Sequence, residues 1–346
     1  MNDHRASLTR RSLVGLLGLA GLGLSACGGS SSAGTAAAPT PVTSPSPATT
    51  TSTVQADATE SPEPGGDPTA GPSEAVSAPD ETAEDTTTSS VTDTFAALEK
   101  TYDTRLGLYA LDTGSGRSLT HHADDRFAMA STFKVLAVGA LLKKNGTDGL
   151  SKVIRYGRAD LVPNSPITQS RTSMSLGDLC AAALRYSDNT ASNLVLQQVG
   201  GPLGVTRFVR TLGDEVTRLD RTEPALNSVT PGDKRDTSTP RNLGNSYLAL
   251  LGGEYLDEVS RNQLREWLLG STTGDNRIRA GVAKGWKVAD KTGTANYGTM
   301  NDVGLIYPTR NRAPIVLSIL TGRDSKNAER HEKLIEEATR AVLKAL

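Results

Sequence analysis

The chain changes sharply in composition near residue 88, and this change restricts the fold to the C-terminal part. Residues 28–88 consist mainly of Ser, Thr, Pro, Ala and Gly with scattered acidic residues and almost no large apolar side chains. Such a segment cannot bury enough apolar surface to offset the chain entropy lost on folding. We therefore expect a disordered tether over 28–88 and one globular domain over 89–346.

Residues 1–27 have the pattern of an export signal. Twin arginines at positions 10 and 11 precede an apolar run over 13–24, and the stretch ends in LSAC. This run is shorter than the roughly 20 residues of a spanning helix, which disfavours a transmembrane segment. The arginine pair resembles a twin-arginine signal and LSAC resembles a lipobox, which implies lipidation of Cys27 and a membrane lipoprotein on the outer face of the cell, partly secreted. Ordinary cleavage after Ala26 is the alternative.

Charge, cysteine and histidine content exclude several functions. The net charge is -1, and no basic stripe indicates nucleic-acid binding. The chain contains two cysteines, Cys27 in the predicted signal and Cys180 in the predicted domain, so a disulfide within the domain is impossible. The apolar helical pattern around Cys180 favours a buried, inert thiol. The histidines, among them His121 and His122, accompany no serine motif, and there is no H-E-x-x-H or cysteine cluster. We expect a monomer with no metal and no cofactor.

Hydrophobic periodicity predicts strands at both ends of the domain and helices between them. A short helix over 92–102 precedes strands over 105–112 and 117–122, and strands over 303–308 and 313–322 precede a final helix over 326–346. Helical patterns cover 131–144, 175–187, 192–201, 202–213, 240–253 and 260–271. This order predicts an α+β fold in which the N- and C-terminal strands form one antiparallel sheet flanked by helices, with an inserted all-helical subdomain. A cleft between the two parts is the expected site.

Ser131 and Lys134 are three residues apart at the start of the apolar pattern AMASTFKVLAVGALL. In a helix this spacing brings both side chains to one face, where free backbone N-H groups also lie. An unpaired buried ammonium costs several kcal/mol, roughly, which argues for a compensated role. Taken alone, the pair is equally consistent with a capping serine and a lysine whose amine reaches solvent.

Two further segments carry polar side chains with possible chemistry. Tyr-Ser-Asp-Asn at 186–189 separates two helical patterns, and by itself it is typical of a capping turn. Val-Ala-Asp-Lys-Thr-Gly-Thr-Ala at 288–295 has the pattern of an edge strand, on which a lysine often only prevents strand pairing. The order S-x-x-K, S-D-N, K-T-G, however, is the motif set of serine β-lactamases and penicillin-binding proteins. The domain resembles this family over essentially its whole length.

The segment RTEPALN at 221–227, followed by PGDKRDT at 231–237, resembles the omega loop of class A β-lactamases. The resemblance implies that Glu223 and Asn227 hold the water that releases the acyl group, that Arg221 and Asp236 form an ion pair closing the loop, and that the peptide bond before Pro224 has unusual geometry. Penicillin-binding transpeptidases generally lack this loop. The implied function is antibiotic resistance through β-lactam hydrolysis.

The resemblance also implies a role for each motif residue. Ser131 is the nucleophile, Lys134 or Glu223 takes its proton, and Ser187 passes a proton to the lactam nitrogen. The backbone N-H groups of Ser131 and Thr294 form the oxyanion hole. The remaining residues bind substrate. Asn189 contacts the amide of the substrate's side chain, and Asn227 helps Glu223 to position the hydrolytic water at the acyl carbonyl. Around the ring carboxylate lie Lys291, Thr292, Gly293, Thr294 and Arg277.

Several positions differ from many members of the family. Val138 occupies the position of the cysteine that would pair with Cys180, so the domain depends on packing alone. Asn164 replaces an aromatic residue of the substrate entrance, and Ala225 replaces a glutamate of the omega loop. Thr294 occurs in relatives with broader activity, which leads us to expect cephalosporins as well as penicillins among the substrates.

Two other functions share part of the motif set. A D-alanyl-D-alanine peptidase acting on cell-wall peptides would need the first three motifs but neither Glu223 nor Asn227. A penicillin sensor or binding lipoprotein would be acylated at Ser131 and remain so. The omega-loop pattern favours the β-lactamase.

Overall fold

The computed structural model describes residues 81–309 and 312–346, with side chains from Val91 onward. The predicted signal, Cys27 and most of the predicted tether lie outside the described residues. Among the described helices, none has the length and apolar character required to span a bilayer.

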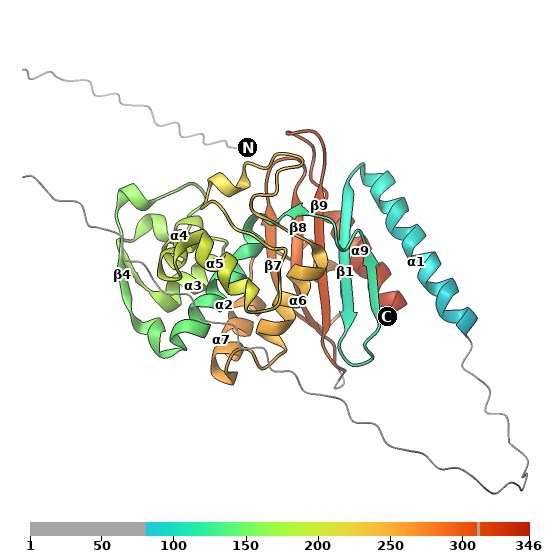
Figure 1. Cartoon of the computed structure of the whole chain (residues 1–346), viewed down its shortest axis with the longest axis horizontal. Coiled ribbons are helices and arrows are strands. Elements are labelled where there is room, and N and C mark those ends of the chain that lie inside the picture. The colour runs from blue at the N-terminus through green and yellow to red at the C-terminus, as the bar shows by residue number, and fades with distance from the viewer. Residues whose placement is uncertain (1–80, 310–311) are drawn as a thin grey trace, which may run out of the picture. The chain divides into compact units, whose positions relative to one another are not determined.

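A five-stranded antiparallel sheet forms the centre of the domain, in the order β2-β1-β9-β8-β7. The strands are β1 (Arg105–Asp112), β2 (Ser118–His121), β7 (Lys287–Thr294), β8 (Met300–Tyr307) and β9 (Ile315–Gly322). Thus β1 pairs along its whole length with β9, which joins the first and last parts of the domain. The predicted α+β fold with one sheet built from both ends of the chain is confirmed (Figure 1).

Helices cover both faces of the sheet. On one face, α1 (Glu81–Tyr102) packs beside α9 (Glu332–Ala345), and the short α8 (Ile278–Gly281) contacts α9. The inserted helices lie on the opposite side of the sheet from α1 and α9 (Figure 1). They are α2 (Phe133–Asn145), α3 (Leu176–Arg185), α4 (Asn189–Gln198), α5 (Gly201–Arg210), α6 (Pro240–Leu251) and α7 (Glu258–Leu269).

Side-chain caps fix where several of these helices begin. The Ser175 side chain accepts a hydrogen bond from Asp178 N at α3, and the Asp188 side chain accepts one from Ala191 N at α4. Thr239 caps α6 in the same way, with a proline at the first helical position. Such caps satisfy N-H groups that have no partner within the helix and contribute about 1 kcal/mol each.

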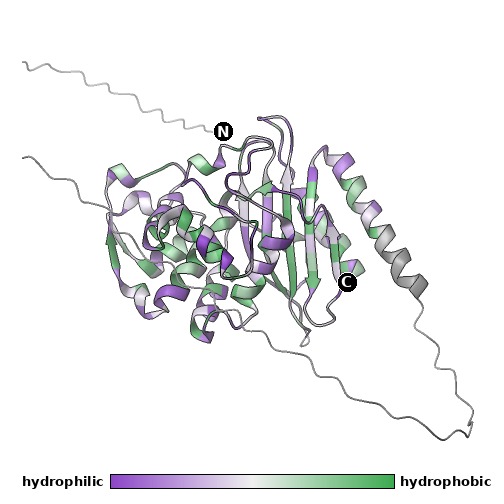
Figure 2. Ribbon diagram, in the orientation of Figure 1, coloured by the Kyte–Doolittle hydropathy of each residue, from purple (hydrophilic) through white to green (hydrophobic). Residues whose placement is uncertain are grey.

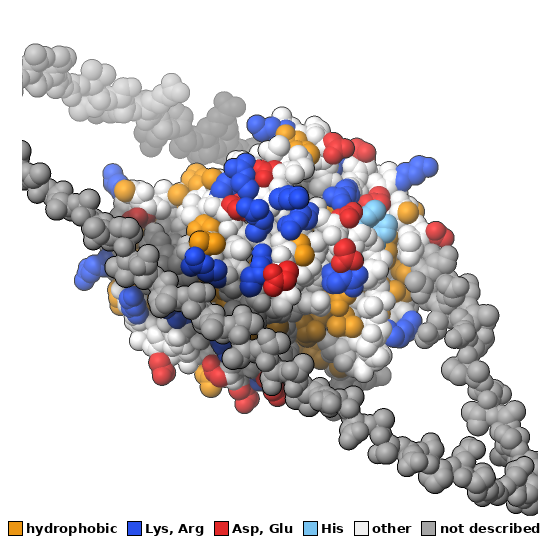
Figure 3. All heavy atoms as spheres, in the orientation of Figure 1, with side chains coloured by type: hydrophobic (Ala, Val, Ile, Leu, Met, Phe, Trp, Pro, Cys, Tyr) orange, Lys and Arg blue, Asp and Glu red, His pale blue; other side chains and the backbone are white. Residues whose placement is uncertain are grey.

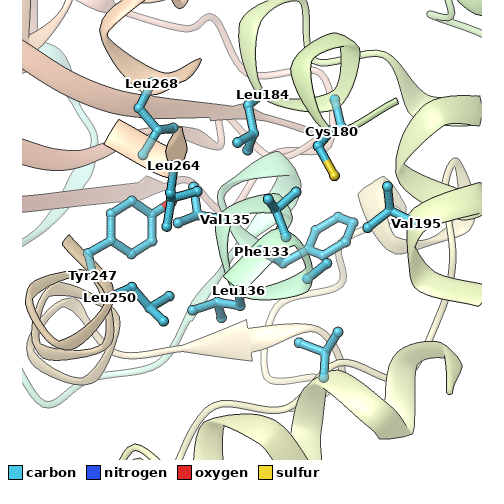
Figure 4. Close-up of a cluster of buried hydrophobic side chains, with 14 of the residues drawn as sticks. Phe133, Val135, Leu136, Cys180, Leu184, Val195, Tyr247, Leu250, Leu264 and Leu268 are labelled. Atoms are coloured by element: carbon cyan, nitrogen blue, oxygen red, sulfur yellow. The ribbon is translucent and has the colours of Figure 1, made fainter. Parts of the chain in front are cut away.

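Two apolar cores lie on the two faces of the sheet. One surrounds α2, in which every residue from Phe133 to Leu142 is buried, and Figure 4 shows Phe133, Val135 and Leu136 among side chains of the neighbouring helices. The other joins the sheet to α1 and α9. Green apolar ribbon is concentrated accordingly along the sheet and the inner helices in Figure 2. Burial of each large apolar side chain contributes about 1.5–3 kcal/mol.

The Cys180 thiol is part of the core around α2. Its side chain is fully buried, and burial raises the pKa of the thiol. Cys180 is unbonded, as expected with Val138 in place of a partner cysteine. The predicted burial of Cys180 is confirmed.

The boundaries of some elements differ from the predictions. Helix α1 begins at Glu81 rather than 92, so it includes residues 81–88 that composition alone assigns to the tether. The last helix begins at Glu332 rather than 326. Two small sheets were also missed, β3 (Phe127–Ala128) with β6 (Thr237–Ser238) and β4 (Val153–Arg155) with β5 (Ser173–Ser175), because strands of two or three residues are too short for a periodic signal.

Candidate active site

Ser131 lies in a 3-10 turn, η1 (Ala130–Thr132), that leads directly into α2. Lys134 is in the first turn of α2, and both residues are buried. Strand β7 packs closely against this turn. A Cβ atom at Gly293 would lie 2.7 Å from the Met129 carbonyl oxygen, so the absence of a side chain at Gly293 allows the two backbones to approach.

The ammonium of Lys134 is surrounded by acceptors. Its Nζ donates to Asn189 Oδ1 at 2.7 Å and to the Ser187 carbonyl at 2.8 Å, and it lies 3.2 Å from Glu223 Oε1. It also donates to Ser187 Oγ at 3.3 Å. Burial lowers the pKa of Lys134, and the charge of Glu223 opposes that shift. The charge of this buried lysine is therefore compensated from several directions, as the sequence predicts.

The turn between α3 and α4 supplies Ser187 and Asn189. Ser187 has a left-handed backbone with φ of 55°, which is uncommon for a residue with a side chain. Asp188 caps α4, and Asn189 Nδ2 donates to the Pro163 carbonyl at 2.9 Å, which turns the amide oxygen toward Lys134. The Ser-Asp-Asn segment is thus a capping turn and also brings two polar side chains into the site.

Glu223 approaches Ser131 from the loop that the sequence identifies. Its Oε1 accepts from Ser131 Oγ at 3.3 Å, and its Oε2 accepts from Asn227 Nδ2 at 2.5 Å. The Glu223 side chain is fully buried. Asn193 of α4 holds the backbone of Glu223 in both directions: Glu223 N donates to Asn193 Oδ1 at 3.0 Å, and Asn193 Nδ2 donates to the Glu223 carbonyl at 2.8 Å.

The loop around Glu223 is closed by an ion pair. Arg221 Nε lies 2.5 Å from Asp236 Oδ2, while Asp236 Oδ1 accepts from the N-H groups of Asp220 and Arg221. The Glu223–Pro224 peptide bond is cis. The ion pair and the unusual peptide bond implied by the resemblance are both present.

Lys291 of β7 lies on the other side of Ser187. Its Nζ donates to Ser187 Oγ at 3.1 Å and to the Thr292 carbonyl at 2.9 Å. Burial, together with the charges of Lys134 and Arg277, lowers the pKa of Lys291 to about 7. Lys291 is therefore buried in the site, and the alternative of a solvated lysine on an edge strand is wrong, although β7 is an edge strand.

Two further hydroxyls of β7 face the site with partners of their own. Thr292 Oγ1 lies 2.7 Å from Thr273 Oγ1, and Thr294 Oγ1 accepts from an Arg277 terminal nitrogen at 2.9 Å. The other donors of Arg277 are engaged by the carbonyls of Gly293 and Asn301 and by Glu332. Arg277 therefore positions Thr294 in addition to lining the site.

These side chains surround a cavity of about 600 Å³ between the helical part and β7. Its wall contains Ser131, Ser187, Asn189, Asn227, Arg277, Thr292 and Thr294, together with Asn164, Ser165, Pro166, Gln169, Tyr186 and Thr273. The structure thus brings together the residues predicted for the site, with Lys134, Glu223 and Lys291 immediately behind the wall. Ser131 Oγ contacts the Glu223 carboxylate, and Ser187 Oγ contacts both lysines, an arrangement that suits acyl transfer.

Sequence reasoning missed Asn193 and Thr273. Asn193 lies four residues after Asn189, hence on the same side of α4, and that spacing was the available signal. Thr273 belongs to a segment without periodicity, and nothing in the sequence links it to Thr292.

Sequence reasoning also does not single out Asp290 and Asp302, which are both fully buried. Burial raises the pKa of Asp302 well above its ordinary value, and the charge of Asp290 adds to that shift.

Comparison with known proteins agrees with this geometry. The model of the β-lactamase enzyme family matches residues 90–346. Beta-lactamase 3 of Bacillus cereus is 49% identical over 254 residues, covering 73% of this chain and 80% of its own. Beta-lactamase FAR-1 of Nocardia farcinica is 50% identical over 256 residues, covering 73% of this chain and 82% of its own. A crystal structure of a β-lactamase from Desulfarculus baarsii superposes with a TM-score of 0.73 at 46% identity and covers 74% of this chain and 97% of that one. The chain belongs to the β-lactamase enzyme family.

Proposed function

We propose that this chain is a class A serine β-lactamase that hydrolyses penicillins and cephalosporins and so confers resistance to them. As a member of its family the chain is a β-lactam hydrolase. The observation that carries the finer proposal is the position of Glu223, whose carboxylate contacts both the Ser131 hydroxyl and the Asn227 amide. A carboxylate between a nucleophile and a second hydrogen-bond donor is suited to hold and deprotonate water.

Acylation begins with attack of Ser131 Oγ on the lactam carbonyl carbon. The hydroxyl proton leaves to Glu223, either directly or through a water, or to Lys134, and the Oγ–C bond forms as the carbonyl becomes an oxyanion. The backbone N-H groups of Ser131 and Thr294 are the donors that we assign to this oxyanion. Two such donors together supply several kcal/mol of stabilisation, roughly, because they are oriented before the charge develops.

The ring nitrogen needs a proton when the lactam C–N bond breaks. Ser187 Oγ is hydrogen-bonded to both Lys134 and Lys291, so it can give its proton to the nitrogen and regain one from a lysine. Lys291, with the hydroxyls of Thr292 and Thr294, is the assigned partner of the substrate carboxylate. Asn189 Oδ1 and Asn227 are assigned to the acyl side chain and the hydrolytic water, respectively.

Deacylation uses Glu223 a second time. The carboxylate takes a proton from a water that attacks the ester carbonyl, and the Ser131–acyl bond breaks with return of a proton to Ser131 Oγ. General-base assistance of this kind is worth about a hundredfold to ten-thousandfold in rate. Both the peptidase and the sensor alternatives lack this assisted step, so the fate of the acyl-enzyme separates them from the β-lactamase.

The test is the stoichiometry of one reaction. A chromogenic cephalosporin is added in large excess to the purified chain, hydrolysis is followed by absorbance, and the same sample is analysed by intact mass. Hydrolysis of many equivalents with little adduct is expected. A single equivalent consumed with a persistent adduct would make the protein a penicillin sensor, and faster release of D-alanine from a D-alanyl-D-alanine peptide than of β-lactam product would make it a peptidase.

We also propose export through the twin-arginine-type signal and lipidation at Cys27, with the enzyme held as a monomer on the outer face of the membrane. The support is the sequence of residues 1–27 alone. Expression with labelled fatty acid should label the parent chain and leave Cys27→Ser unlabelled and in the medium. Equal labelling of both chains, or retention of Cys27→Ser at the membrane, would refute lipidation.

A further inference from the structure

A cluster of metal-binding residue types lies on the edge of the sheet opposite the active site. Glu99 of α1 brings Oε2 to 3.1 Å from His121 Nε2 and to 3.8 Å from His122 Nε2. The three potential ligand atoms all lie within 4.8 Å of one another. The histidines are at the end of β2, and the active-site strand β7 is at the other edge of the sheet. Figure 3 shows histidine atoms beside acidic and basic side chains on one exposed face.

The local backbone explains how two consecutive histidines reach one carboxylate. Neighbouring side chains in a strand point to opposite faces, which would separate His121 from His122. His122, however, has a left-handed backbone with φ of 45°, which ends this alternation. The two imidazole rings consequently lie with their centroids 4.5 Å apart and nearly edge to face.

The atoms of Glu99 and His122 that do not face the cluster have partners of their own. Glu99 Oε1 accepts from Leu106 N at 2.7 Å, which leaves Oε2 for the histidines. His122 Nδ1 lies 3.2 Å from Asp125 Oδ2, which also accepts from Arg105 at 2.6 Å. A carboxylate on the far nitrogen of an imidazole is the usual way in which proteins orient a metal-binding histidine.

His121 gives the independent indication of a missing partner. Its side chain is only 9% exposed, and its Nε2 is buried without a hydrogen bond among the described residues, although it is directed at Glu99 Oε2 from 3.1 Å. A buried polar nitrogen without a partner costs about 1–3 kcal/mol. A cation between the imidazole and the carboxylate would remove that cost.

We propose that Glu99, His121 and His122 bind one Zn²⁺ ion. Two imidazole nitrogens and one carboxylate oxygen form a ligand set typical of zinc, and adjacent ligands around a tetrahedral ion lie roughly 3.4 Å apart. The two measured separations, 3.1 and 3.8 Å, bracket that value. His122 is 44% exposed, so water completes the coordination. The ion joins α1 to the end of β2 and thereby stabilises the packing of α1 against the sheet. It takes no part in catalysis.

Zinc titration of the full, untagged chain, stripped of metal with a chelator, tests the proposal. Calorimetry should show one Zn²⁺ per chain, and Zn²⁺ should raise the melting temperature. His122→Gln should bind at least tenfold more weakly, and Asp125→Asn about tenfold to a hundredfold more weakly, because Asp125 orients His122. His331→Gln is the matched control, because this histidine lies against Tyr102 and outside the cluster. Its loss should change neither the affinity for Zn²⁺ nor the rise in melting temperature that Zn²⁺ causes.

Cobalt supplies a second readout that does not depend on stability. One equivalent of Co²⁺ should give a visible absorption band in the parent that is absent from the double variant His121→Gln/His122→Gln. Cephalosporin turnover should be equal in the parent and the His122→Gln variant, since neither histidine belongs to the active site. No binding by the parent, or unchanged binding by the double variant, would show that the cluster is only a set of ion pairs.

Discussion

Lys134 Nζ and Glu223 Oε1 lie 3.2 Å apart with both side chains fully buried, and Ser131 Oγ donates to the same carboxylate oxygen. An ion pair removed from water contributes little net stability, but the loss of one partner leaves a costly unpaired charge. The pair is therefore better explained by chemistry than by folding. It holds a base within hydrogen-bond reach of the Ser131 hydroxyl and a proton carrier within reach of the Ser187 hydroxyl.

The pKa of Lys291 predicts the pH profile of substrate capture. Only the protonated ammonium attracts a carboxylate, and the protonated fraction falls as pH rises through about 7. The kcat/KM for a penicillin should therefore decline on the alkaline side from about that pH, whereas kcat, which reports the complex with a carboxylate bound, should decline at higher pH. Lys291→Arg, whose charge persists, should lose the inflection. An unchanged inflection in that variant would assign it to another group, such as Lys134.

Gly293→Ala should damage catalysis more than folding. The added Cβ would meet the Met129 carbonyl at 2.7 Å, so the turn carrying Ser131 must move. A displacement of about 1 Å can cost roughly a hundredfold in rate, and kcat/KM should fall by about that factor. Gly322→Ala is the control, because no atom lies within 4 Å of its added Cβ. Equal kcat/KM values for the two variants would contradict the close approach of β7.

Removal of the Arg221 charge should loosen the loop that carries Glu223. Asp236 is only 2% exposed at its side chain, and Arg221→Met would leave its charge unpaired. We expect a loss of about 2 kcal/mol in the free energy of unfolding, measured with urea, and slower deacylation. Arg235 lies in the same loop and forms a more exposed ion pair with Asp233. Arg235→Met should therefore change neither the free energy of unfolding nor the rate of deacylation. Equal effects of the two substitutions would remove this role for the ion pair.

Thr294→Ala should lower cephalosporin turnover more than penicillin turnover. The hydroxyl of Thr294 lines the cavity and is held by Arg277, so it is fixed where we propose that the ring carboxylate binds. Thr294→Ser keeps the hydroxyl and should restore most of the activity toward both substrates. Steady-state kinetics on one penicillin and one cephalosporin measure the ratio, and equal losses on both would eliminate the specificity role.

The fold was predictable from the sequence because its strongest signals are local. Apolar residues at alternate positions mark β1, a nearly continuous apolar run marks β9, and a long apolar segment marks α2, so the order of elements and the shared sheet follow from the sequence. The start of α1 at Glu81 did not follow. That helix begins in a Thr- and Ser-rich stretch with weak intrinsic helix propensity.

The sequence predicts which residues gather around the cavity, but not the network of contacts among them. The motifs identify Ser131, Lys134 and Lys291, yet the burial of Lys291 depends on the turn at Ser131 packing against β7, a contact between distant segments. Asn193 and Thr273 act through partners far away in the chain and have no motif. The Glu99–His121–His122 cluster was likewise hidden, because it depends on the left-handed backbone of His122 and on a contact between α1 and β2.

The most direct test of the central claim is the fate of the acyl group in Glu223→Gln, which keeps the size of the side chain and removes the base. The parent and Glu266→Gln, an exposed glutamate on α7, are treated in parallel with the same penicillin, and peptide mass mapping locates any adduct. We predict a stable adduct on Ser131 in Glu223→Gln alone, with turnover reduced at least a hundredfold. Turnover equal to the parent, without an adduct, would contradict the role of Glu223 in deacylation.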